Sequence, residues 1–193
     1  MFERIGLWWR YDGRYMHKEF ARGIKNLWRW FPIIWKDRDW DHTYIYKIIE
    51  TKLQFQAKGI GGRDRHTTAK RDAEKMRTVA KLIERCREGF YEMEYMDYHE
   101  SEIKFIPTDE TKKWYTMEDN ILSENFEAYF KKYPRQYKRV ISGEAEWVKN
   151  YIDPITEDHH PRKIAMCIAN ENQDRCRKLI FKIMESEIER WWD

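Results

Sequence analysis

The sequence predicts an all-α protein, a compact multi-helix bundle of five to six helices with irregular connections, folded as a single helical domain over residues 1–193. Apolar residues recur at three- and four-residue steps along most of the chain, which is the period of an amphipathic helix. Segments with the two-residue alternation of a strand are short. A length of 193 residues with 41% hydrophobic content is enough for one core of ordinary size.

The ends of the expected helices follow from caps, glycines and prolines. Asp41 is the expected N-cap of the second helix, and Gly59 ends that helix because glycine commonly stops helices. Pro134 separates the fourth helix from the fifth, since proline cannot continue a helix. We expect helices over about 15–31, 41–59, 67–98, 118–133, 135–151 and 161–191, with one minor strand near 103–116.

Charge and cysteine content narrow the class of protein. The chain has 37 Lys and Arg against 34 Asp and Glu, so its net charge of +3 lacks the broad basic field of a duplex-binding protein, and any anion site must be local. The cysteines at positions 86, 167 and 176 lie in helical patterns without paired spacing, which favours free thiols in a reducing cytosol. We find no secretory h-region and no apolar window long enough to span a membrane, and therefore expect no membrane partner.

One stretch of the chain, WRWFPIIWKDRDWD, interleaves aromatic and charged residues. Aromatic faces stack on nucleobases and cationic side chains bind phosphates, so this stretch points to a nucleotide or nucleic acid. The candidate ligand-binding residues here are Trp35, Arg38, Trp40 and Tyr44. The alternative interpretation is that these aromatics are core anchors of a helical domain.

A glycine-rich turn precedes the third expected helix. Gly59, Gly61 and Gly62 lead into a helix N-terminus, where free backbone N–H groups and the helix dipole favour a phosphate. The candidate phosphate-binding residues are Arg63, Arg65, His66, Thr67 and Lys70. The segment lacks the GxxxxGK[ST] and GxGxxG patterns, and the alternative is a solvated loop whose glycines only stop a helix.

A second aromatic and basic stretch, KKYPRQYKR, covers residues 131–139. Arg135 and Arg139 are its candidate ligand-binding residues, in a stacking wall or in contact with single-stranded nucleic acid. The alternative is a solvated helix face, because long basic side chains often cover helix exteriors.

Metal-binding and catalytic patterns fail on inspection. Asp37, Asp39 and Asp41 copy the first ligand spacing of an EF-hand loop, but His42 replaces the required glycine and Ile48 the required glutamate. The segment DPITEDHHP, with its adjacent histidines, is more typical of a loop between helices than of a metal site. We find no paired acids and no nucleophile beside a histidine, and therefore expect a protein without cofactor or metal that is not an enzyme.

Three segments carry a resemblance to a known family: WFPIIWKDRDWDHTYIYKIIETKL, EAYFKKYPRQYKRV and RKLIFKIMESEIERWWD. Together they cover a little under a third of the chain, and they resemble a family of small tailed-bacteriophage proteins. The resemblance implies a viral protein that acts in the host cytoplasm. Phage accessory proteins of this size include anti-defence sponges, such as the helical sequestering proteins that counter Thoeris immunity. These sponges bind cyclic nucleotide or ADP-ribose-derived signals without cleaving them.

The aromatic and cationic content extends this resemblance to a function. We expect the chain to sequester a small nucleotide-derived immune signal between its helices, at the interface of a homodimer, and so to serve immune evasion. Two alternatives stay open at this point. One is a nucleic-acid-binding accessory protein that uses residues 131–139, and the other is a helical adaptor that binds a host protein through exposed tryptophans.

Overall fold

The computed structural model describes residues 13–38, 40–62, 67–108, 113–146, 148–150 and 155–191, without the side chains of Arg14 and Asn150. Helices hold 71% of these residues, which confirms a mostly helical protein. Contacts divide the chain into two units, Met1–Ile48 and Ile49–Asp193, and we describe each by itself. The expectation of a single domain stays a prediction.

The first unit contains η1 (Gly13–Tyr15), α2 (Met16–Ile34) and the start of α3 (Thr43–Gly61). Helix α2 contains Pro32 in its last turn and ends where the Trp35 N–H bonds the Phe31 carbonyl at 2.9 Å. Asp41 Oδ1 accepts a hydrogen bond from the Thr43 backbone N–H at 2.9 Å, so the expected cap of this helix is confirmed.

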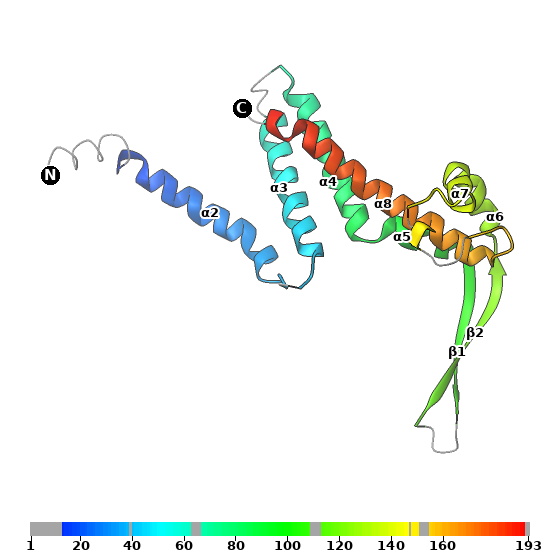
Figure 1. Cartoon of the computed structure of the whole chain (residues 1–193). Helices are drawn as coiled ribbons and strands as arrows, with labels where there is room; N and C mark the ends of the chain where they lie inside the picture. The colour runs from blue at the N-terminus through cyan, green and yellow to red at the C-terminus, as the bar shows by residue number, and fades with distance from the viewer. Residues whose placement is uncertain are drawn as a thin grey trace. The chain divides into compact units, whose positions relative to one another are not determined.

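The second unit is built on two long antiparallel helices, α4 (Ala69–Arg87) and α8 (Pro161–Glu187), which lie side by side (Figure 1). Lys75 Nζ bonds Glu187 Oε1 at 2.6 Å near one end, and Gln173 Nε2 donates to the Cys86 carbonyl at 2.7 Å near the other. The α4 stripe that packs inward has the spacing expected of an amphipathic helix. Its buried apolar members are Ala69, Ala73, Met76, Val79, Ala80, Ile83 and Cys86.

The expected helix over 67–98 is too long. Helix α4 ends at Arg87, and Gly89 follows it with a φ of 65°, a left-handed conformation that stops a helix. The chain continues as the short helix α5 (Phe90–Met93) and the 3₁₀ turn η2 (Glu94–Tyr98). The break turns the chain away from α4 and brings α5 against α8.

A two-stranded antiparallel hairpin follows, formed by β1 (His99–Pro107) and β2 (Tyr115–Glu124), and it extends away from α6, α7 and α8 (Figure 1). The minor strand expected near 103–116 is therefore part of a longer hairpin. The helix expected over 118–133 is wrong in its first half, because residues up to Glu124 are in β2. Alternation decides the strand: Tyr115, Met117 and Ile121 share one face of the hairpin.

Three elements pack around the first half of α8: α6 (Phe126–Lys132), α7 (Pro134–Ile141) and η3 (Val148–Asn150). Their shared core consists of Phe126, Tyr129, Val140, Ala145, Val148, Ile155, Ile164, Ala165, Cys167 and Ile168. The 3₁₀ turn η4 (Ile188–Arg190) follows the end of α8. Trp191, directly after η4, is also buried. The described residues contain seven α-helices rather than five to six, mainly because Gly89 separates α5 from α4.

Candidate functional site

Three of the residues predicted to bind a ligand meet in the first unit. Arg38, Trp40 and Tyr44 line a pocket of about 390 Å³ between the end of α2 and the start of α3. Trp35 is not part of its lining, and instead its ring contacts that of Phe31, with centroids 5.3 Å apart. Trp35 and Trp40 are both exposed, at 76% and 84%, so the alternative that they are core anchors is wrong.

The charge of this first pocket does not suit an anion. Asp37 and Asp41 line it together with Arg38, so two carboxylates face one guanidinium. The hydrogen bond from the Thr43 backbone N–H holds the pKa of Asp41 below its usual value, so this carboxylate is charged at neutral pH. A phosphate placed here would be repelled more than attracted.

The glycine-rich turn is only partly described. Arg63, Arg65 and His66 lie outside the described residues, while Thr67 and Lys70 are exposed near the start of α4. The first turn of α4 already holds a carboxylate, because Asp72 is buried and accepts a hydrogen bond from Thr68 Oγ1 at 2.6 Å. A carboxylate at this position uses the helix dipole that a phosphate would otherwise use.

Gly61 has a structural reason of its own. A Cβ at this position would lie 2.9 Å from Cβ of Ala73, closer than real Cβ atoms come to a neighbour. The glycine therefore permits the close approach of α3 and α4 rather than the approach of a ligand.

The two predicted arginines on α7 have different surroundings. Arg135 is exposed, whereas Arg139 Nε donates to Glu171 Oε1 at 3.0 Å, and Glu171 is only 3% exposed. Arg139 therefore neutralises a buried carboxylate on α8. That role competes with binding a ligand phosphate, which stays a prediction for both residues.

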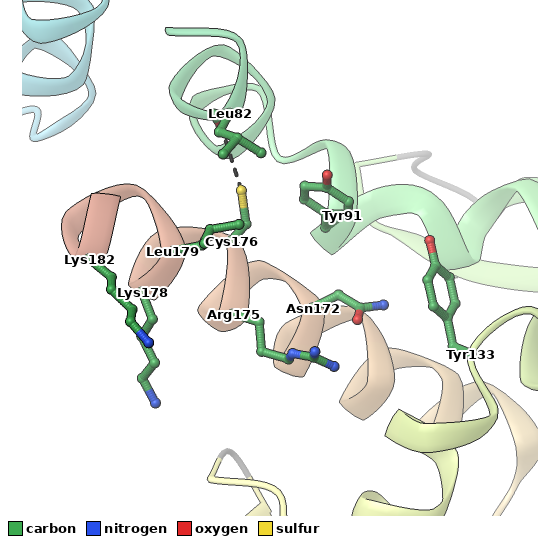
Figure 2. Close-up of a pocket in the computed structure, with 9 residues that line it drawn as sticks. All are labelled: Leu82, Tyr91, Tyr133, Asn172, Arg175, Cys176, Lys178, Leu179 and Lys182. Atoms are coloured by element: carbon green, nitrogen blue, oxygen red, sulfur yellow. Dashed lines mark hydrogen bonds between the residues drawn. The ribbon is translucent and has the colours of Figure 1, made fainter. Parts of the chain in front are cut away.

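A second pocket, which sequence reasoning missed, lies between α4, α5 and α8. It has a volume of about 430 Å³, and Figure 2 shows its lining. In the part of the chain that the structure describes, cationic, aromatic and apolar side chains contribute to it, and no carboxylate does. The lining residues are Leu82, Tyr91, Tyr133, Asn172, Arg175, Cys176, Lys178, Leu179 and Lys182.

Hydrogen bonds fix the walls of this second pocket. The thiol of Cys176 donates to the Leu82 carbonyl at 3.6 Å, the dashed line in Figure 2, and so ties α8 to α4. Tyr133 donates its hydroxyl proton to Glu94 Oε2 at 2.6 Å. Burial, together with this hydrogen bond, raises the pKa of Tyr133, so its ring stays neutral and in place at neutral pH.

The cations of the second pocket come from one face of α8. Arg175, Lys178 and Lys182 follow one another at three- and four-residue steps, and their side chains leave α8 on the same side (Figure 2). Lys178 pairs with Glu146. Among the described residues, Arg175 and Lys182 have no hydrogen-bond or ion-pair partner.

One further donor lies in the same wall. Asn172 is 8% exposed, and its side chain lies beside the buried hydroxyl of Tyr129, with which its Nδ2 forms no well-aligned hydrogen bond. A buried donor without a partner is costly, and an acceptor atom of a ligand in the pocket would satisfy it. The second pocket can therefore hold a flat, anionic molecule.

The remaining polar residues of interest have structural roles. Nδ1 of His159 accepts a hydrogen bond from the Thr156 backbone N–H, and Nδ1 of His160 accepts one from the Arg162 backbone N–H at the start of α8. No three His, Cys, Asp or Glu side chains of the described residues are placed to hold a metal ion. The three cysteines are free thiols, as expected. No helix within the described ranges has both the length and the apolar content to cross a membrane.

Comparison with known proteins gives no relative for the chain. No protein-family model, curated protein or solved structure matches it. The resemblance to tailed-bacteriophage proteins therefore stays an expectation from the sequence.

Proposed function

We propose that the protein binds and retains a small anionic nucleotide in the second pocket, between α4, α5 and α8, without cleaving it. One observation carries the proposal: among the described residues, three cations and two tyrosines line this pocket and no carboxylate does. Its volume, about 430 Å³, lies within the range of roughly 300–1,000 Å³ that is usual for small-molecule sites.

Each lining residue has a role that its chemistry suits. Arg175 and Lys182 bind phosphate oxygens through charge-assisted hydrogen bonds, since neither is engaged by a described side chain. Tyr91 and Tyr133 offer ring faces for stacking on a base. Asn172 donates from its buried Nδ2 to an acceptor on the ligand.

The composition of the lining favours retention over turnover. Its described residues include no histidine and no carboxylate that could serve as a general base. The lining also holds the thiol of Cys176, and the neighbouring Cys86 thiol, together with burial, raises the pKa of Cys176. A thiol that stays protonated at neutral pH is a poor nucleophile.

The biological setting belongs to the proposal as well. A phage protein of this kind acts in the host cytoplasm, where it removes a cyclic nucleotide or ADP-ribose-derived signal and so blunts anti-phage defence. This setting rests on the sequence resemblance, as does the homodimer. The pocket itself lies within the second unit of one chain.

Calorimetric titration with ADP-ribose and a panel of cyclic dinucleotides tests the proposal. Arg175→Glu should weaken binding of the recognised nucleotide by about 10- to 100-fold, because a charged hydrogen bond to phosphate is lost. The matched control is Arg177→Glu on the same helix, since Arg177 pairs with Asp174 and does not line the pocket.

Two results would contradict the proposal. If both variants bind as tightly as the parent, or if no nucleotide of the panel binds, the second pocket is not the site. If heating the loaded protein releases a cleaved product at more than one equivalent per chain, the protein is an enzyme.

A further inference from the structure

Helix α2 is strongly amphipathic. At about 100° per residue, eight of its large apolar side chains fall on one arc roughly 160° wide, and Ile33 lies outside it. Trp30 lies at one edge of this arc, and the other seven residues are Met16, Phe20, Ile24, Leu27, Trp28, Phe31 and Ile34. All seven are exposed; Phe20 is at 70%, Leu27 at 68% and Trp28 at 82%.

The opposite side of α2 is cationic. It carries Lys18, Arg22, Lys25 and Arg29, and its one acidic residue is Glu19, so four cations less one anion leave a charge of +3. Glu19 Oε1 lies 2.9 Å from Nη1 of Arg22, which pairs the two within the helix. Lys18 and Lys25 on the same face add positive charge that this pair does not use.

The tryptophans mark the edges of the apolar arc. Trp28 falls on one edge and Trp30 on the other, where the apolar face meets the polar one. An indole ring with its N–H prefers such a boundary, and tryptophan is enriched where membranes meet water. Helix α2 has 19 residues and is therefore about 28 Å long, enough for an extended contact with a surface.

We propose that α2 lies flat on an anionic lipid bilayer, with its apolar arc among the upper acyl chains and its cations facing the lipid headgroups. Helices that lie at a membrane surface have this combination of aromatic residues on one face and Lys or Arg on the other. No side chain of α2 is buried within the described part of the protein, so its apolar arc is available for such a contact. Charge complementarity selects the partner, because an anionic surface attracts the excess cations, whereas a second copy of α2 would present the same cations. The proposal goes beyond nucleotide binding, and it does not require α2 to cross the bilayer.

Co-sedimentation of the full chain with lipid vesicles tests the proposal. The protein should bind vesicles of phosphatidylcholine mixed with phosphatidylglycerol, and bind more weakly to phosphatidylcholine alone or at high salt. Lys18→Glu combined with Lys25→Glu should weaken binding to the anionic vesicles at least about 25-fold, because each lost cation contributes roughly fivefold. Leu27→Glu should also weaken it, through the apolar face.

The matched control makes the same charge change elsewhere. Lys131 and Lys138 are exposed on α6 and α7, and Lys131→Glu combined with Lys138→Glu should leave vesicle binding unchanged. Because α2 has no buried side chain, its variants should keep the melting temperature of the parent, which circular dichroism checks.

Three outcomes would overturn the proposal. The parent fails to sediment with anionic vesicles, or the control pair weakens binding as much as the α2 pair does. The third outcome is that light scattering shows an oligomer for the parent and a monomer for Leu27→Glu, while neither protein binds vesicles. That result would mean that the apolar arc contacts a second copy of the chain.

Discussion

Four basic residues of this chain pair with buried carboxylates. Glu50, Asp72, Glu94 and Glu171 are each buried, and each lies beside a basic side chain. Their partners are Arg87, Arg71, Lys132 and Arg139, respectively. A buried charge without a partner is strongly unfavourable, so these cations serve the fold. The sequence alone does not separate them from Arg175 and Lys182, since all occur in similar charged helical patterns.

The Arg139–Glu171 pair gives a prediction for stability. Arg139→Leu should lower the free energy of unfolding by roughly 2–4 kcal/mol, because Glu171 would stay buried without its cation while the arginine itself is half-exposed. Arg135→Leu, on the same helix but exposed, should change it by less than about 0.5 kcal/mol. Urea titrations of both variants measure the difference. Equal effects would show that Arg139 is not required by the buried carboxylate.

The Lys75–Glu187 pair gives a prediction for pH dependence. The hydrogen bond from Lys75 holds the pKa of Glu187 below its usual 4.5, so the pair stabilises the fold above that pH and loses its effect as the pH falls through the folded-state pKa. Lys75→Met should therefore lower the urea midpoint near pH 7, and its difference from the parent should shrink as the pH falls below 4.5 and through the folded-state pKa of Glu187. Lys81→Met, at an exposed position of α4, is the control. A difference that is constant with pH would assign the effect to packing.

At the scale of elements, periodicity predicted most of the helices and missed where they stop. The apolar stripes of α4 and α8 are regular enough to be predicted from the sequence, and the N-cap of α3 at Asp41 was predicted as well. The end of α4 depends on the left-handed conformation of Gly89, which an isolated glycine in a helical pattern does not reveal. Residues 118–124 of β2 were expected in a helix, because the apolar residues of this strand also fit a helical spacing over a short window.

The hairpin gives a prediction at this scale. Ile103 and Asp119 are register partners, so deleting residues 104–118 and joining these two through Asn-Gly keeps a tight antiparallel turn. Every described residue that this deletion removes is exposed, and the ion pair of Arg162 with Asp119 at 3.2 Å remains. The free energy of unfolding should therefore change by less than about 1 kcal/mol in a urea titration.

Two comparisons make the hairpin test specific. Arg162→Ala in the shortened chain reports whether the retained ion pair still holds the base of the hairpin. A loss of more than about 2 kcal/mol from the deletion alone would mean that the apolar face of the hairpin, with Ile103, Phe105 and Met117, is covered in solution.

At the scale of the whole molecule, the site could not be found from local sequence patterns. The second pocket combines side chains from positions 82 to 91, 133 and 172 to 182, which only the packing of α4 and α5 on α8 brings together. Sequence reasoning favoured clusters of neighbouring residues instead. It correctly grouped Arg38, Trp40 and Tyr44, which do share a pocket, but the charge of Asp37 and Asp41 in the same lining makes that pocket unsuitable for a phosphate.

Separating the two proposed activities is the decisive test at this scale. A chain that begins with an added Met before Asp41 keeps α3 with its cap and the whole second unit, and lacks α2. It should melt close to the parent, because α2 contributes no buried side chain. It should bind the nucleotide with unchanged affinity, since every residue of the second pocket is retained, and it should no longer sediment with anionic vesicles. Calorimetry and co-sedimentation on the same preparation measure both. Loss of nucleotide binding in this folded chain would reject the second pocket and would instead assign the site to Trp35, Arg38 and Trp40, which the truncation removes. The membrane proposal for α2 would then depend only on the vesicle experiment.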